Sequence, residues 1–263
     1  MLPIGDDNRF RRRFPLVTWT LIVLNALVFV YAWQLGQQRF IEFTYAFGTV
    51  PCEVTGRCPA FVEREQVVRD AFGRARVARI PIPYLETERP IPAVLTLLTA
   101  IFLHGGWLHL LGNLLYLHIF GDNVEDRLGR GKYLLVYLSS GVLASIAQVA
   151  VAPGATIPAV GASGAIAGVM GAYLYLFPGA RIRTLVFLGF FITMIWLPAL
   201  LVIGFWFVIQ LFQGLASLGV QTLGQQGGVA YFAHIGGFLA GLVWMWLLRP
   251  RRGHGYWDRF ARR

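Results

Sequence analysis

The stretch from Tyr231 to Leu248 reads YFAHIGGFLAGLVWMWLL and contains no Asp, Glu, Lys or Arg. An apolar helix needs roughly 17–25 residues to cross a hydrocarbon core about 30 Å thick, so this stretch is long enough to span a membrane. Five more apolar runs precede it, at residues 15–34, 107–121, 133–152, 162–177 and 197–218. The six runs predict an all-α polytopic membrane protein, a bundle of six transmembrane helices.

The composition also indicates that lipid is the main solvent of this chain. Hydrophobic residues make up 56% of the sequence and charged residues 14%, whereas a soluble globular domain carries roughly 25% charged residues. The net charge of +10 would suggest nucleic-acid binding in a soluble protein. Here the arginines gather before the first apolar run and after the last one. We interpret them as topology anchors, with acidic partners or lipid headgroups as the alternative, and predict no nucleic-acid partner.

Basic residues in the connecting segments predict the orientation. Two loops hold such residues, namely Arg127, Arg130, Lys132, Arg181 and Arg183. The loops at 152–160 and 219–230 carry no charge. Since Lys and Arg concentrate in cytoplasmic loops, both termini are expected in the cytoplasm of a cell (inner) membrane, with an organelle inner membrane as the alternative.

The chain therefore divides into three expected parts. These are a basic cytoplasmic segment at 1–14, a membrane domain at 15–249 and a basic cytoplasmic tail at 250–263. The first apolar run is too long for a signal peptide and lacks a small-residue cleavage site, so we expect it to be retained as a span. Residues 185–196 are apolar but short for a span, which favours a re-entrant or interfacial piece.

A long loop at 36–106 separates the first two runs and mixes both signs of charge with many prolines. Long loops translocate largely regardless of charge, so we expect this one to be extracytoplasmic. Its apolar part, at 94–103, is too short to cross alone and is expected in the membrane interface. The loop holds the only two cysteines, Cys52 and Cys58. A disulfide and two free thiols both remain open, whereas a metal site is disfavoured because no second ligand pair stands nearby.

Three polar groups lie near the predicted outer ends of apolar runs. Ser163 follows a chargeless loop, His234 lies in the last run, and His109 and Asn113 are four residues apart on one helical face. An ionisable residue inside an apolar span is costly and is usually retained for function. Structural alternatives are a serine bonded to its own backbone, a satisfied buried histidine and a polar pair that ties helices together.

Small residues predict that the helix of Ser163 packs against the helix of His234. Gly164 and Gly168 are four residues apart, and so are Gly237 and Gly241. Such pairs let two helix backbones approach closely in a membrane. Close contact of these two helices would bring the Ser163 hydroxyl within reach of an imidazole that can take its proton.

At these residues the chain resembles the rhomboid family of intramembrane serine proteases. The family's Gly-x-Ser-Gly motif matches 161–164, its Ala-His-x-x-Gly-x-x-x-Gly motif matches 233–241, and its His-x-x-x-Asn motif matches 109–113. A fourth match holds Glu125 and Arg127, which look like the family's pair at the cytoplasmic end of the second span. The resemblance covers nearly all of the spans.

The resemblance implies a role for each matched residue. Ser163 would be the nucleophile and His234 the general base and acid, a dyad without a carboxylate. The Ser163 backbone N–H would form an oxyanion hole with His109 and Asn113. Supporting positions would be His104, as a structural histidine, and the motif glycines Gly161, Gly164, Gly168, Gly237 and Gly241. No metal or organic cofactor is implied, and the expected partners are transmembrane segments of other membrane proteins within the lipid bilayer.

Two departures from the family's pattern affect neighbours of the site. Leu95 and Thr96 stand where many members carry a Trp-Arg pair, and Ala167 stands where some members place a tyrosine that stacks on the catalytic histidine. Neither change deletes a reacting group. The positioning of His234 is therefore expected to rely on other neighbours.

A mobile loop between the last two spans is expected to cover the site, because three glycines make it pliable: Gly224, Gly227 and Gly228. Two other classes of function remain as alternatives. A catalytically inactive relative that binds membrane clients usually lacks the serine or the histidine, and both are present here. A small transporter or channel would carry charged groups at mid-membrane, whereas the ionisable residues here lie near helix ends.

Overall fold

The computed structural model describes residues 1–7, 11–69, 75–84, 89–188, 191–221 and 229–250. The described part of the chain is mostly helical. Its helices are α1 (Leu16–Gln34), α2 (Gln37–Phe47), α3 (Pro51–Thr55), η1 (Ala93–Leu95), α4 (Thr96–Thr99), η2 (Ala100–Phe102), α5 (Trp107–Leu128), α6 (Arg130–Val151), α7 (Ser163–Leu176), α8 (Ala199–Gln221) and α9 (Tyr231–Leu248). Its strands are β1 (Leu2–Asp6), β2 (Phe61–Arg69), β3 (Ala75–Pro83), β4 (Arg181–Leu188) and β5 (Phe191–Pro198).

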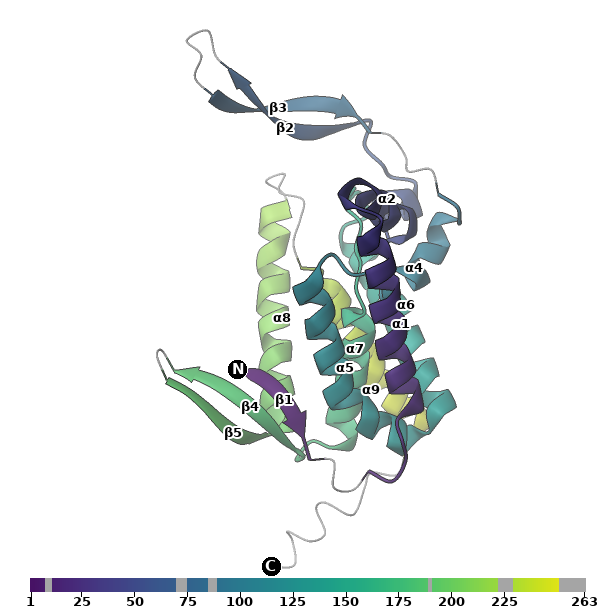
Figure 1. The fold of residues 1–263 in the computed structure, drawn as a ribbon, viewed down its shortest axis with the longest axis vertical. Coiled ribbons are helices and arrows are strands. Elements are labelled where there is room, and N and C mark those ends of the chain that lie inside the picture. The colour runs from purple at the N-terminus through teal and green to yellow at the C-terminus, as the bar shows by residue number, and fades with distance from the viewer. Residues whose placement is uncertain (8–10, 70–74, 85–88, 189–190, 222–228, 251–263) are drawn as a thin grey trace, which may run out of the picture.

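A helix occupies each of the six apolar runs, and these helices form one bundle (Figure 1). By length and composition, four of the described helices can cross a membrane, namely α1, α6, α8 and α9. A fifth span results if residues 93–102 and α5, which meet at an angle of 76°, count as one broken span. Helix α7 is shorter, with 14 residues, and every residue from 164 to 173 is buried. The neighbours of α7 therefore screen it from lipid.

The expectation of an all-α fold is wrong at both ends of the bundle. Strands β1, β4 and β5 form an antiparallel sheet near the N-terminal end of α8. Strands β2 and β3 pair with each other at the opposite end of the bundle (Figure 1). The described part of residues 185–196, expected as a re-entrant or interfacial piece, lies in the paired strands β4 and β5. Its sequence is rich in β-branched and aromatic residues, which favour strands. Apolar side chains of these strands, Ile192 and Trp196 among them, are exposed.

The N-terminal segment is attached to the bundle by carboxylates of α5. Glu125 is 3% exposed, and its oxygens accept bonds from the backbone N–H groups of Val17 (3.0 Å) and Thr18 (2.8 Å). These N–H groups open helix α1 and have no carbonyl partner within it, so Glu125 caps that helix. Arg11 pairs with Asp122 at 2.7 Å. The basic segment thus docks on the end of α5.

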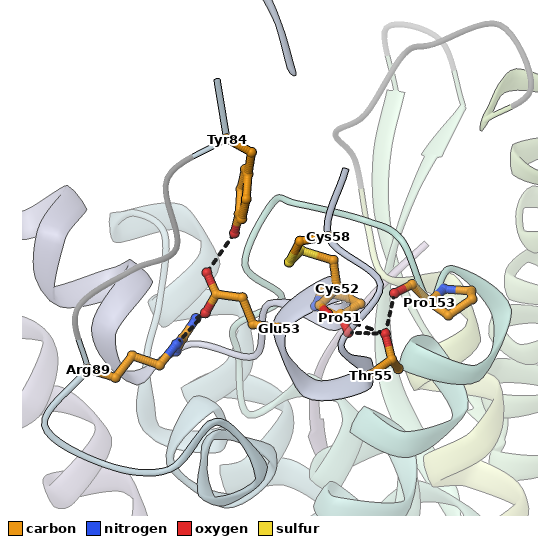
Figure 2. Close-up of a disulfide and its surroundings, with 8 residues drawn as sticks. All are labelled: Pro51, Cys52, Glu53, Thr55, Cys58, Tyr84, Arg89 and Pro153. Carbon is orange, nitrogen blue, oxygen red and sulfur yellow. Dashed lines mark hydrogen bonds and ion pairs between the residues drawn. A yellow bond between two sulfur atoms is a disulfide. The ribbon is translucent and has the colours of Figure 1, made fainter. Parts of the chain in front are cut away.

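The part of the first loop around α3 packs against the bundle and holds a disulfide between Cys52 and Cys58 (Figure 2). Beside it, Glu53 forms an ion pair with Arg89. The Thr55 hydroxyl donates to the carbonyl of Pro153 at 2.7 Å, and the Cys52 N–H donates to that of Ala155 at 3.0 Å. The disulfide-closed turn therefore holds the segment that connects α6 to α7, and that segment leads directly to the start of α7.

Removing the disulfide is expected to destabilise this protein. In the Cys52→Ala/Cys58→Ala double variant, the free energy of unfolding should fall by roughly 2 kcal/mol, because the short covalent loop no longer restricts the unfolded chain. Thermal unfolding in detergent measures the change. Dithiothreitol should lower the stability of the wild type and leave the double variant unaffected. An equal response of both proteins to the reductant would contradict the prediction.

Asp6 fastens strand β1 to the bundle. Its Oδ2 accepts bonds from the Tyr173 hydroxyl at 2.8 Å and from Asn123 Nδ2 at 2.6 Å. Its Oδ1 is buried and has no hydrogen-bond partner among the described residues. Burial, together with the carboxylates of Asp122 and Asp7, raises the pKa of Asp6 from 3.8 to about 7, against the opposing effect of the two hydrogen bonds. Docking of β1 therefore favours the protonated form of the Asp6 carboxyl, with the proton on Oδ1.

The raised pKa of Asp6 predicts pH-dependent docking of β1. Its contribution to stability is complete below about pH 4, where the carboxyl is protonated in both states, and it is lost as the pH rises through about 7. The Asp6→Asn variant, which keeps a neutral side chain, should melt at a higher temperature than the wild type at pH 8 and at a similar temperature at pH 4.5. A difference that is the same at both pH values would exclude this linkage.

Candidate functional site

A cavity of about 1200 Å³ lies between α5, α7, α8 and α9. Most of its wall is apolar, but several polar side chains converge on it from separate elements. They are His109 and Asn113 on α5, Ser163 at the start of α7 and His234 on α9. The four residues named from the three sequence motifs therefore share one cavity.

The backbone before α7 places Ser163 at the cavity wall. Gly161 has a φ of +132°, which favours glycine, and a Cβ there would come within 2.8 Å of the His109 ring. The Gly161 N–H donates to the carbonyl of Ala100 at 2.9 Å, which fixes the turn. As the first residue of a helix, Ser163 has a backbone N–H without an intrahelical acceptor, at the positive end of the helix dipole.

Ser163 and His234 are in hydrogen-bond contact. The Ser163 Oγ lies 2.8 Å from Nε2 of His234. The other ring nitrogen, Nδ1, lies 2.7 Å from Oε1 of Gln210 on α8. In the tautomer that satisfies both contacts, Nδ1–H donates to Gln210, and Nε2 accepts the hydroxyl proton of the serine.

This contact depends on backbone packing between α7 and α9. A methyl group on Gly237 would overlap the carbonyl oxygen of Gly164, and one on Gly241 would overlap that of Gly168. Gly168 in turn faces the Ser140 side chain of α6. The two glycine pairs expected to bring helices together therefore meet each other directly.

His109 and Asn113 offer hydrogen-bond donors beside Ser163. The Gly105 N–H approaches Nδ1 of His109 at 3.4 Å, so a neutral His109 ring carries its proton on Nε2, the atom next to Gly161. Asn113 is 7% exposed, and its Nδ2 has no partner in the described part of the chain. A buried donor left unpaired costs roughly 1–3 kcal/mol. An oxygen atom arriving at this position would remove that penalty.

Of the supporting residues, His104 lies beside His109, whereas Glu125 and Arg127 lie at the other end of α5. His104 is 3% exposed and packs edge-on against the His109 ring, with 5.2 Å between the centroids. Glu125 caps α1 sixteen residues further along α5 than His109, which corresponds to about 24 Å. Arg127 is exposed at that same end. His109 thus lines the cavity, whereas His104 and Glu125 do not.

The sequence did not single out two neighbours of His234, Gln210 and Trp206. Gln210 is 6% exposed, and the Trp206 ring lies 5.9 Å from the His234 ring at an angle of 38°. They are one helical turn apart on α8, so they face the same side. The available signal was Gln210 itself, a polar residue within an apolar run. At the opposite position on α7, Ala167 is fully buried and provides no ring.

Some predicted features lie outside the described residues. These are the loop glycines Gly224, Gly227 and Gly228 and nearly all of the basic tail at 250–263. Of the residues that replace the Trp-Arg pair, Leu95 is exposed, and Thr96 is buried with its carbonyl bonded to the Thr49 hydroxyl at 2.9 Å. This bond ties Thr96, on α4, to the chain near the start of the first loop.

The close contact between the glycines of α7 and α9 predicts that a single added methyl group lowers the stability of the protein. Gly241→Ala should destabilise the protein by about 1–3 kcal/mol, because the backbones of α7 and α9 must separate. Gly204→Ala on α8 is the matched control, since a Cβ there meets nothing within 4 Å. Thermal unfolding in detergent compares the two variants. Equal melting temperatures for both would contradict the close contact.

The site lies within a segment that is similar to known proteins. The family model for the Rhomboid domain matches residues 92–251. Rhomboid protease GluP of Bacillus subtilis (strain 168) is 38% identical over 144 residues, which cover 55% of this chain and 25% of GluP. Putative rhomboid protease YdcA of the same organism is 41% identical over 80 residues, or 30% of this chain and 40% of YdcA.

A eukaryotic relative matches a longer segment. Rhomboid protein 1, mitochondrial, of Saccharomyces cerevisiae is 28% identical over 169 residues, which cover 60% of this chain and 43% of that protein. The matched segments therefore span from a quarter to less than half of the length of these three relatives.

Proposed function

This chain belongs to the rhomboid family, and from that premise we propose that it is an intramembrane serine endopeptidase that cleaves transmembrane segments of other membrane proteins. The observation that carries the proposal is the 2.8 Å contact between Ser163 Oγ and His234 Nε2 inside a cavity. A hydroxyl paired with an unprotonated imidazole nitrogen is an activated nucleophile.

In the first step, Nε2 of His234 takes the hydroxyl proton while Oγ of Ser163 attacks the carbonyl carbon of the peptide bond. The carbonyl oxygen becomes an oxyanion, and preorganised donors stabilise it by roughly 3–4 kcal/mol each. The backbone N–H of Ser163, Nε2–H of His109 and Nδ2 of Asn113 take this role. The unpaired state of Asn113 Nδ2 supports the assignment.

In the second half of the reaction, the tetrahedral intermediate collapses and His234 gives its proton to the leaving amine. One fragment departs, and the other remains as an ester on Ser163. Water then attacks the ester carbon as Nε2 of His234 accepts a proton from it. The second tetrahedral intermediate collapses, the bond to Ser163 Oγ breaks, and His234 returns its proton to Oγ as the second fragment leaves with a new carboxyl group. The cavity supplies the room for substrate and water, and no metal or cofactor takes part.

The proposed topology has six spans, with both termini in the cytoplasm of the cell membrane and a long first loop outside. Helix α7 counts as a span although it is short, because its neighbours bury it and it needs no contact with the full lipid thickness. The disulfide of the first loop supports an oxidising outer compartment. The site then faces outward, and a substrate helix must unwind locally to present an extended bond.

Replacing Ser163 by Ala is expected to lower cleavage of a reconstituted single-span substrate by at least about 10⁴-fold, because the attacking oxygen is gone. A fluorophosphonate probe should label the wild type and neither Ser163→Ala nor His234→Ala. Ser139→Ala is the matched control, since that hydroxyl donates to carbonyls of its own helix α6, and it should keep full activity. Substrate binding without cleavage by the wild type would favour a client-binding relative instead.

A further inference from the structure

Gln210 occupies an unusual environment on α8. It is 6% exposed within a helix that is apolar over most of its length. A buried carboxamide is costly unless it is hydrogen-bonded, and polar residues inside membrane helices are usually retained for function. The Oε1 atom of Gln210 lies 2.7 Å from Nδ1 of His234, on the ring edge opposite the serine contact.

We propose that Gln210 is a positioning residue that holds His234 in the tautomer able to accept the Ser163 proton, which extends the reacting unit to three side chains. This inference rests on the proposed function for its catalytic meaning. It concerns the state of the imidazole, which is measurable without any substrate.

The argument follows from which atoms can donate. A neutral imidazole has one N–H, on either Nδ1 or Nε2, and a carbonyl oxygen can only accept. With the proton on Nδ1, the ring donates to Gln210 and its Nε2 lone pair faces the Ser163 hydroxyl. With the proton on Nε2 and the carboxamide oriented as in the structure, the Nδ1 lone pair would face Oε1 at 2.7 Å, and the ring could not take the serine proton.

The same carbonyl supports the charged form of the ring. When His234 takes the serine proton, Nδ1–H becomes part of an imidazolium and its bond to Oε1 becomes charge-assisted and stronger. An amide oxygen has no net charge, so its effect is weaker than that of the aspartate in a Ser-His-Asp triad. The carboxamide thus replaces part of what a carboxylate would supply, without placing a buried negative charge among apolar helices.

Trp206 lies on α8, like Gln210, and its ring lies beside the His234 ring. The centroid of its ring lies 5.9 Å from that of the His234 ring, and the two planes are tilted by 38°. Helix α8 therefore contacts the imidazole twice, at Nδ1 through Gln210 and through the tilted ring of Trp206. This arrangement supplies the orientation that the stacked tyrosine of other family members would provide.

The kinetic test uses the second-order rate of fluorophosphonate labelling of Ser163 as a function of pH. Gln210→Leu removes the acceptor at similar volume and should lower the rate at pH 7 by about 10- to 100-fold. Gln210→Glu keeps an acceptor, and it should restore labelling and move the midpoint of its pH profile upward, because a carboxylate favours the imidazolium. A Gln210→Leu rate equal to that of the wild type would overturn the proposal.

The ring itself is tested by ¹⁵N NMR of histidine-labelled protein, with the His234 signals assigned from a His234→Gln variant. We expect a protonated Nδ1 and an unprotonated Nε2 in the wild type and a mixture of tautomers in Gln210→Leu. Gln34→Leu is the matched control, since Gln34 is exposed at the end of α1 and does not line the cavity, and it should leave the tautomer unchanged.

The two measurements separate the two proposals. If the wild type is not labelled but Gln210→Leu still changes the tautomer, the proposed protease function fails and the positioning role stands. If labelling depends on Ser163 and His234 while the tautomer is the same with and without Gln210, the protease function stands and the positioning role is overturned.

Discussion

The contact between the backbones of α7 and α9 is the constraint on which the rest of the structure depends. Gly164 and Gly168 on one helix face Gly237 and Gly241 on the other, with no side chain between them. In lipid the hydrophobic effect does not drive helices together, so such close packing is a principal source of their association. It places the first turns of both helices side by side, and a hydroxyl and an imidazole occupy those turns.

The neighbouring elements supply what this pair of helices lacks. Helix α5 contributes the buried side-chain amide of Asn113, whose Nδ2 has no hydrogen-bond partner among the described residues. Helix α8 contributes the carbonyl of Gln210, which lies next to Nδ1 of His234. The disulfide-closed turn of the first loop holds the chain that enters α7. The polar groups near the cavity thus come from four helices, α5, α7, α8 and α9, and a polar site is preserved inside an apolar bundle.

Much of this arrangement was predictable from the sequence. Apolar runs reveal where helices lie, and the small residues of α7 and α9 indicate which helices meet. Strands β4 and β5 were missed because residues 181–198 are largely apolar, a pattern that does not distinguish a strand from a helix. The pairing of β1 with β4 joins residues about 180 positions apart. Gln210 was missed because its partner depends on the rotation of α8 about its axis.

The glycine contact also limits how the helices can move. Two backbones in van der Waals contact cannot slide without collision, so α7 and α9 behave as one rigid body. Ser163 and His234 lie on these two helices and stay together, whereas Gln210, beside the other ring nitrogen of His234, lies on α8, outside the glycine contact. A shift of α8 would therefore change the second contact of the imidazole without moving the serine away from the first.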